Sequence, residues 1–100
     1  METDDGGDVR AQIVFAQVPD DRREAYLKAW TEWTGTLFGM EIRAQLYESE
    51  KRPGEFTEFT LFEEGKEAAL ADDRITRING ELSAAAETRT GALEFHTRIN

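Results

Sequence analysis

Large apolar side chains alternate with polar ones from residue 56 to residue 62, and this alternation predicts a β-strand. Phe59 and Leu61 lie on one face of such a strand. The other face carries Phe56, Glu58 and Phe62. A strand with bulky side chains on both faces is typical of a sheet that is covered on both sides. We therefore expect helices on one side of this strand and a second protein surface on the other.

Similar patterns predict three more strands, at about 9–18, 40–50 and 90–99. The tetrapeptide KRPG at 51–54 has the proline and glycine order of a tight turn, so the strands on either side of it form a hairpin. The order of the apolar and charged stretches leaves two intervals, about 20–38 and 66–87, for helices. The chain thus reads strand, helix, strand, strand, helix, strand.

Both helical intervals carry apolar residues at helical spacing. Tyr26, Trp30, Trp33 and Leu37 form one stripe, and the helix that they predict ends near Gly39. The second stripe steps by three and four residues and contains Ala68, Ala71, Ile75, Ile78, Leu82 and Ala85. The Asp72-Asp73 pair interrupts it and favours a new helix start. We expect a short helix, a break, and then a longer helix.

This order predicts an α+β fold of the ferredoxin-like β-α-β-β-α-β type, a four-stranded antiparallel sheet with both helices on one face. Right-handed crossovers place the first and third strands in the middle. The expected helix-facing set is Ile42, Ala44, Leu46, Phe59, Leu61, Leu93, Phe95 and Ile99, and the expected opposite set includes Gln12, Val14, Ala16, Val18, Arg43, Gln45, Tyr47, Phe56, Glu58 and Phe62. Because the opposite set is rich in apolar residues, we expect a second copy of the chain to cover it.

Composition narrows the possible functions. The chain has 100 residues, which suit one domain, and we expect residues 1–8 to form a disordered tail ahead of a single domain at 9–100. The net charge of −9 disfavours nucleic acid and anionic membranes as partners, although an acid-rich, halophilic source would give the same excess. No apolar run or signal segment is evident, so a cytoplasmic location is expected. With no cysteine and one histidine, we expect no metal site.

The element order, the length near 100 residues and the doubly apolar sheet resemble the dimeric α+β barrel superfamily. The antibiotic-biosynthesis-monooxygenase-like branch is the most similar, and the acidic stretch EEGKEAAL at 63–70 is the most suggestive piece. The resemblance implies a homodimer formed through the sheet face. It also implies cofactor-independent oxidation of aromatic molecules, in a pocket between the sheet and the helices. Haem-degrading relatives need an axial histidine on the second helix, which this chain lacks, so we expect no cofactor.

One group of residues has acid–base potential. His96 lies near Glu94 and Arg98 in the sequence, and the expected sheet brings Arg43 and Glu58 to the same face. A histidine between carboxylates can act as a general base near neutral pH, so His96 and Arg43 are the candidate catalytic residues. The alternative is a structural network of ion pairs at the dimer interface.

Aromatic residues supply a candidate substrate site. Trp30 and Trp33 can hold a flat ring between the first helix and the sheet, with Tyr47 and Phe59 as further contacts, and the candidate walls also include Tyr26 and Phe38. Alternatively, these side chains are simply core. Asn79, a polar residue on the second helix, is expected to face solvent. The first hypothesis is a monooxygenase-like homodimer that binds a small aromatic or apolar molecule. The alternatives are a non-catalytic dimeric module, and an isomerase or decarboxylase that uses His96 as a base.

Overall fold

The computed structural model describes residues 9–63, 65–91 and 95–97, and the predicted N-terminal tail lies outside these ranges. The elements follow one another as β1 (Val9–Gln17), a single 3₁₀ turn η1 (Asp20–Arg22), α1 (Arg23–Phe38), β2 (Arg43–Glu48), β3 (Glu55–Glu63), a 3₁₀ segment η2 (Lys66–Ala71), α2 (Asp73–Ala85), β4 (Thr88–Thr90) and β5 (Phe95–Thr97). The predicted order of strands and helices is therefore confirmed, including the break between η2 and α2. Asp72 caps α2, because its side chain accepts a hydrogen bond from the backbone N–H of Arg74 at 2.8 Å.

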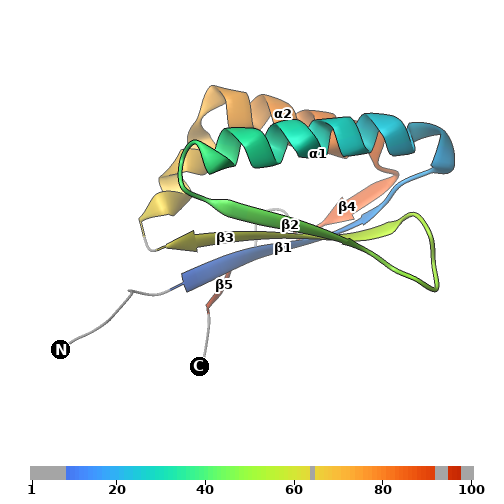
Figure 1. Ribbon diagram of the computed structural model, residues 1–100, viewed down its shortest axis with the longest axis horizontal. Helices are drawn as coiled ribbons and strands as arrows, with labels where there is room; N and C mark the ends of the chain where they lie inside the picture. Colours follow the sequence, from blue (N-terminus) through green and yellow to red (C-terminus); the bar gives the residue numbers. More distant parts are fainter. Residues whose placement is uncertain (1–8, 64, 92–94, 98–100) are drawn as a thin grey trace.

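The strands form one antiparallel sheet in the order β2-β3-β1-β4, and β5 also pairs with β1. The first and third strands thus lie in the centre, as predicted. Helices α1 and α2 lie side by side over one face of this sheet, and no other described element covers the opposite face (Figure 1). We call that opposite surface the open face. Its described residues from the sheet interior are Ala11, Ile13, Phe15, Arg43, Gln45, Tyr47, Thr57, Phe59 and Leu61.

The predicted last strand is divided into two short ones. Gly91 separates β4 from the part of the chain that leads to β5, and its backbone is left-handed, with φ +93°. A Cβ atom at this position would press against the backbone carbonyl of Ile13 on β1. Glycine is therefore required here both for the backbone conformation and for the close approach to the central strand.

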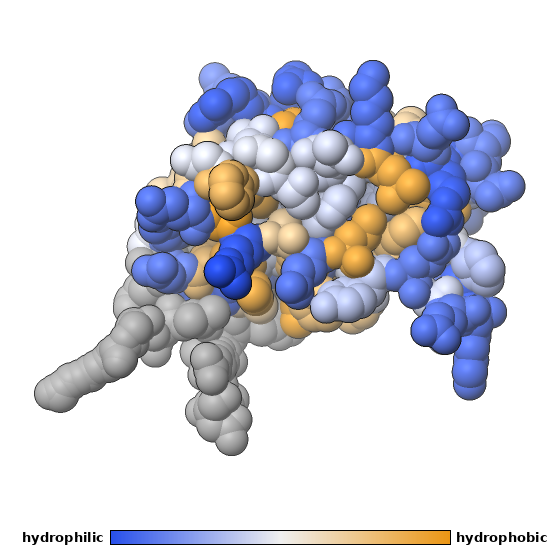
Figure 2. Space-filling model, in the orientation of Figure 1, coloured by the Kyte–Doolittle hydropathy of each residue, from blue (hydrophilic) through white to orange (hydrophobic). Residues whose placement is uncertain are grey.

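The core lies between the helices and the sheet. The largest fully buried side chains include Trp33, Tyr26, Phe62, Leu37, Ile75, Ile78 and Leu82. Figure 2 shows hydrophilic residues gathered over the helix layer, whereas apolar residues reach the surface lower down, between the helices and the sheet. The apolar stripe predicted for α1 is confirmed as its buried face, and so is the part of the second stripe that lies in α2, at Ile75, Ile78, Leu82 and Ala85. The prediction was wrong for Ala68 and Ala71, which lie in η2 and are exposed, because the stripe was extended across the break at Asp72.

The prediction of which strand residues face the helices was correct for β2 and wrong for the two central strands. Val14, Ala16, Phe56 and Phe62 are buried beneath the helices, whereas Phe59 lies on the open face. The hairpin explains this result. Leu46 pairs with Glu58, and directly paired residues share a face, so the even-numbered positions of β3 join those of β2. Periodicity alone could not choose a face, because both faces of β3 are apolar.

Candidate functional site

The two tryptophans predicted to hold a substrate belong to the packed core. Trp33 is 2% exposed, and its indole N–H donates a hydrogen bond to the hydroxyl of Thr60 at 3.3 Å. The rings of Trp30 and Trp33 stack at 6.5 Å between centroids. Phe38, a candidate wall residue, is 81% exposed at the end of α1 and takes no part in this packing. The tryptophans thus fill the space that the sequence assigned to a ligand.

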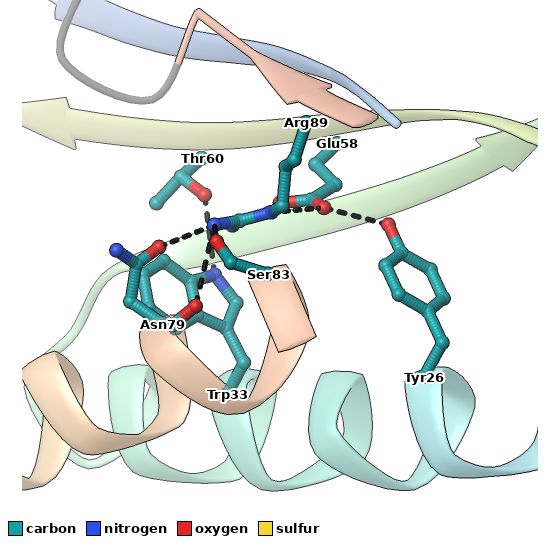
Figure 3. Close-up of polar contacts among 7 residues, drawn as sticks. All are labelled: Tyr26, Trp33, Glu58, Thr60, Asn79, Ser83 and Arg89. Atoms are coloured by element: carbon teal, nitrogen blue, oxygen red, sulfur yellow. Dashed lines mark hydrogen bonds and ion pairs between the residues drawn. The ribbon is translucent and has the colours of Figure 1, made fainter. Parts of the chain in front are cut away.

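Beside them lies a buried polar network centred on Glu58 (Figure 3). Its carboxylate accepts two hydrogen bonds from the guanidinium of Arg89, at 2.9 and 2.7 Å. It accepts a third from the phenol of Tyr26 at 2.6 Å. The side chains of Arg89 and Glu58 are 3% and 2% exposed. This geometry is the bidentate arrangement in which a buried ion pair is best compensated for its loss of hydration.

The other side of the Arg89 guanidinium is held by α2. Its Nη1 donates to the side-chain oxygen of Asn79 at 2.6 Å and to the hydroxyl of Ser83 at 3.1 Å. The prediction that Asn79 faces solvent was therefore wrong, since the residue turns toward the sheet to reach Arg89 (Figure 3). Glu58 also does not share a face with Arg43, because it lies under the helices whereas Arg43 is exposed on the open face.

Sequence reasoning missed Arg89 altogether. The available signal was Glu58 itself, because a carboxylate inside an aromatic strand needs a buried cationic partner. On β4, Arg89 pairs with Ala16 of β1, and this pairing places the arginine on the side of the sheet that faces the helices. The register between these two strands could not be predicted from the sequence.

The network favours a protonated phenol at Tyr26. Burial raises the pKa of Tyr26 far above its ordinary value of 10.0, and the neighbouring Glu58 carboxylate raises it further. Tyr26 therefore remains a hydrogen-bond donor over the whole physiological range. With its donors and acceptors mutually satisfied inside the core, this network has the character of a structural cross-link between the helices and the sheet.

A second ion pair ties the start of α1 to the β2–β3 hairpin. The Glu48 carboxylate accepts a hydrogen bond from Arg23 Nη2 at 2.7 Å and another from the backbone N–H of Gly54 at 2.9 Å. The Arg23 guanidinium also lies 5.4 Å from the centre of the Phe56 ring. The hydrogen bonds from Arg23 and then from Gly54 lower the pKa of Glu48 from 4.5 to about 2.

The lowered pKa of Glu48 predicts that the folded chain loses stability in acid. Because the pKa of Glu48 is lower in the folded chain, its contribution to stability is present above pH 4.5 and is lost as the pH falls toward 2. Glu48→Gln should therefore flatten the pH dependence of the free energy of unfolding in that window, as measured by urea denaturation. Arg23→Gln, which removes the cation and keeps the carboxylate, should flatten the same part of the curve. An unchanged acid slope in both variants would contradict this role.

The remaining candidate substrate residues lie together on the open face. The rings of Tyr47 and Phe59 meet edge to face, with centroids 5.5 Å apart and planes at 86°. The Tyr47 hydroxyl donates to the side-chain oxygen of Gln45 at 3.4 Å. With Thr57, these residues line a recess of about 490 Å³, which we call the Tyr47 recess. The structure therefore divides the four predicted substrate residues into a core pair and an open-face pair.

The predicted catalytic pair is placed only in part. Arg43 is exposed at the start of β2 and pairs with Leu61. Leu61 pairs with Ala11, and the backbone of His96 pairs with Ala11 from the other side, so the four positions form one row across the sheet. The side chain of His96 lies outside what the structure describes, and so do Glu94 and Arg98. The backbone register thus places Arg43 and His96 in the same row of the sheet, on strands three positions apart. That the two residues act together in catalysis stays a prediction.

Another recess, of about 470 Å³, lies on the outer side of the helix layer. Its floor consists of alanines from both helices, and exposed charged side chains form its rim; the lining residues are Arg22, Ala25, Lys28, Ala29, Glu32, Glu81, Ala84 and Ala85. A floor of methyl groups offers no fixed hydrogen-bonding group that would orient a ligand. The Tyr47 recess, which combines aromatic rings with polar side chains, is the better candidate site.

Within the ranges that the structure describes, no cluster of three or more histidine or acidic side chains has the geometry to hold a metal ion. In the same ranges, neither helix has the length and apolar character needed to cross a lipid bilayer.

Comparison of the structure with solved structures identifies the fold. A conserved protein of unknown function from Bacteroides thetaiotaomicron, suggested to be an oxidoreductase, superimposes with a TM-score of 0.73 at 20% identity, over 94% of this chain and 98% of that one. A protein from Nitrosomonas europaea, provisionally named an antibiotic biosynthesis monooxygenase, gives 0.69 at 17% identity, over 98% and 94%. One from Caulobacter crescentus with the same provisional name gives 0.74 at 11% identity, over 95% and 92%.

The chain therefore has the ferredoxin-like α+β fold of these proteins, most of which are named as antibiotic biosynthesis monooxygenases, and the predicted resemblance is confirmed at the level of the fold. No protein-family model matches the sequence, and no curated protein matches it either. At identities of 20% and below, this likeness establishes the architecture alone.

Proposed function

We propose that the protein acts as a homodimer that binds a small, largely aromatic molecule at the open face of its sheet and oxidises it with dioxygen, without a cofactor. The fold that it shares with monooxygenase-like proteins supports the reaction class. The observation that carries the proposal is the open face itself, where Phe15 and Tyr47 are 58% and 57% exposed beside Phe59. Half-exposed aromatic side chains gathered on one sheet face are typical of a surface that binds something.

The reaction has a simple balance. An electron-rich aromatic substrate loses two hydrogen atoms and gains one oxygen atom, while the second oxygen atom of dioxygen leaves as water. The substrate therefore supplies all the electrons, and the protein needs to hold it and to move protons. In this proposal Tyr47 and Phe59 contact the ring, and His96 and Arg43 assist the removal of a phenolic proton.

The test is an oxygen-uptake assay with a panel of naphthols. We expect dioxygen consumption in proportion to the naphthol oxidised, with a quinone as product, at a rate well above that of naphthol alone. His96→Ala should slow this reaction by about 10²–10⁴-fold if the histidine is the general base. Binding of naphthols without any oxygen uptake would refute the proposed oxidation.

A second candidate is a non-catalytic dimeric module that binds a ligand without changing it. One observation favours it: the buried network of Tyr26, Glu58 and Arg89 is fully paired within the core, and so holds no group free for chemistry on the helix side of the sheet. Binding of naphthols with no turnover across the panel would support this candidate over the first.

A further inference from the structure

We infer that the ligand site is shared between two copies of the chain, with a neutral, flat aromatic molecule lying between the two open faces. The inference rests on the proposed homodimer, and it adds the position of the ligand and its chemical class. The Tyr47 recess of each copy forms one wall of this site.

The recess arises from the order of residues across the sheet. Thr57 on β3 pairs with Tyr47 on β2 and with Phe15 on β1, so a small side chain stands between two large rings on the same face. The depression above Thr57 opens toward Gln45 and Phe59, with a volume of about 490 Å³. A smaller recess of about 200 Å³ shares Tyr47 and Thr57 and reaches Phe15. The ring of Tyr47 is thus common to both hollows.

The lining selects the chemistry of the ligand. The Tyr47 recess is lined by an amide, a phenol, a hydroxyl and a phenyl ring, and none of these groups is charged. Gln45, Tyr47 and Thr57 can each donate and accept hydrogen bonds, while the rings of Tyr47 and Phe59 offer edges and faces for stacking. A chain with a net charge of −9 repels anions in addition. These features fit a neutral aromatic molecule that carries hydroxyl or carbonyl groups.

One copy cannot enclose such a ligand. The four lining residues come from two neighbouring strands of a single sheet, so a flat ring that lies on them keeps its outer face in water. Binding sites for small molecules generally bury 70–90% of the surface of the ligand. The site is therefore incomplete until another surface covers it.

The distribution of charge favours a second copy of the chain as the surface that covers the site. The described open-face positions at the centre of the sheet are uncharged apart from Arg43, although the chain as a whole is strongly acidic. Two copies that approach through this face bring no carboxylates from its centre into contact, and they bury their exposed aromatic rings together.

Among the described residues, the side chains between the helices and the sheet are closely packed. Tyr26, Leu37 and Leu82 are 0% exposed there, and Trp33 closes the region next to Thr60. A ligand ring could enter only by displacing close-packed side chains. The shared site thus differs from a pocket between the sheet and the helices of each subunit.

The test separates ligand binding from dimer formation. Leu61→Glu places a carboxylate on the open face without changing any residue of the Tyr47 recess, and should produce monomers by light scattering. Fluorescence titration with naphthol should then show at least a tenfold loss of affinity. Ala84→Glu, which adds the same charge to the exposed outer surface of α2, is the matched control and should retain both the dimer and the affinity.

Two further measurements test the site and the ligand class. In the intact dimer, Tyr47→Phe together with Thr57→Val should weaken naphthol binding about tenfold, because both hydroxyl groups are removed while the shape is kept. Naphthalene carboxylate should bind the wild-type dimer at least tenfold more weakly than naphthol.

Three outcomes would overturn the inference. If the Leu61→Glu monomer binds naphthol as tightly as the wild-type dimer does, the site is complete in one chain, while the proposed homodimer still stands. If the wild-type dimer does not bind naphthol, or binds the carboxylate equally well, the ligand class is wrong. If the wild-type protein is a monomer, the proposed homodimer and the shared site both fail.

Discussion

Arg89→Met should destabilise the protein by about 3–5 kcal/mol, the cost of leaving a buried charge without its partner. The substitution removes the two hydrogen bonds that Arg89 donates to Glu58. The carboxylate, which is 2% exposed in the wild-type protein, keeps the hydrogen bond from the phenol of Tyr26 but loses its cationic partner. Urea denaturation, monitored by tryptophan fluorescence, measures the change in the free energy of unfolding.

Arg77→Met is the matched control. Arg77 also forms a close ion pair, with Glu81 at 2.6 Å, but both side chains are about half exposed, so the loss should be below about 1 kcal/mol. Replacing both buried partners, with Glu58→Met added to Arg89→Met, should restore part of the lost stability because no buried charge remains. Equal effects of Arg89→Met and Arg77→Met would show that the buried network does not hold the helices to the sheet.

Gly91→Ala should cost about 3 kcal/mol or more, because two penalties coincide at one position. The left-handed backbone alone costs an alanine roughly 1–2 kcal/mol. In addition, the new methyl group would press against the carbonyl of Ile13, and overpacking of this kind costs about 1–3 kcal/mol. The loss of stability should appear as a lower urea midpoint and as faster hydrogen exchange of the β1 amides near Ile13.

Gly65→Ala separates the two penalties. Gly65 has the same φ of +93°, but a Cβ atom there would meet nothing within 4 Å, so its substitution should cost only the backbone penalty. A Gly91→Ala variant no less stable than Gly65→Ala would mean that the chain does not approach β1 as closely as the structure indicates.

Local patterns were enough to predict the elements of the fold. The helical spacing of Tyr26, Trp33 and Leu37 gave α1 and its buried face, and the Asp72 cap gave the start of α2. The division of the last strand at Gly91 was not predicted, because it depends on how closely the chain passes β1, which is a tertiary contact.

The candidate site could be predicted less well than the fold. The choice of which face of β3 meets the helices depends on the register of the β2–β3 hairpin, and aromatic residues on both faces hid it. For that reason Phe59 was paired with the core tryptophans in the prediction, although it lies beside Tyr47 on the open face. The partnership of Glu58 with Arg89 joins residues 31 positions apart, and no local pattern reveals it.

The central claim is that a second copy of the chain covers the open face, and the most direct test is the molar mass of the wild-type protein in solution. Light scattering coupled to size-exclusion chromatography should give twice the chain mass of 11.4 kDa across a wide range of concentrations, and Leu61→Glu should reduce it to the mass of one chain. A wild-type protein that stays at 11.4 kDa at high concentration, with Phe15 and Tyr47 in contact with water, would contradict the account.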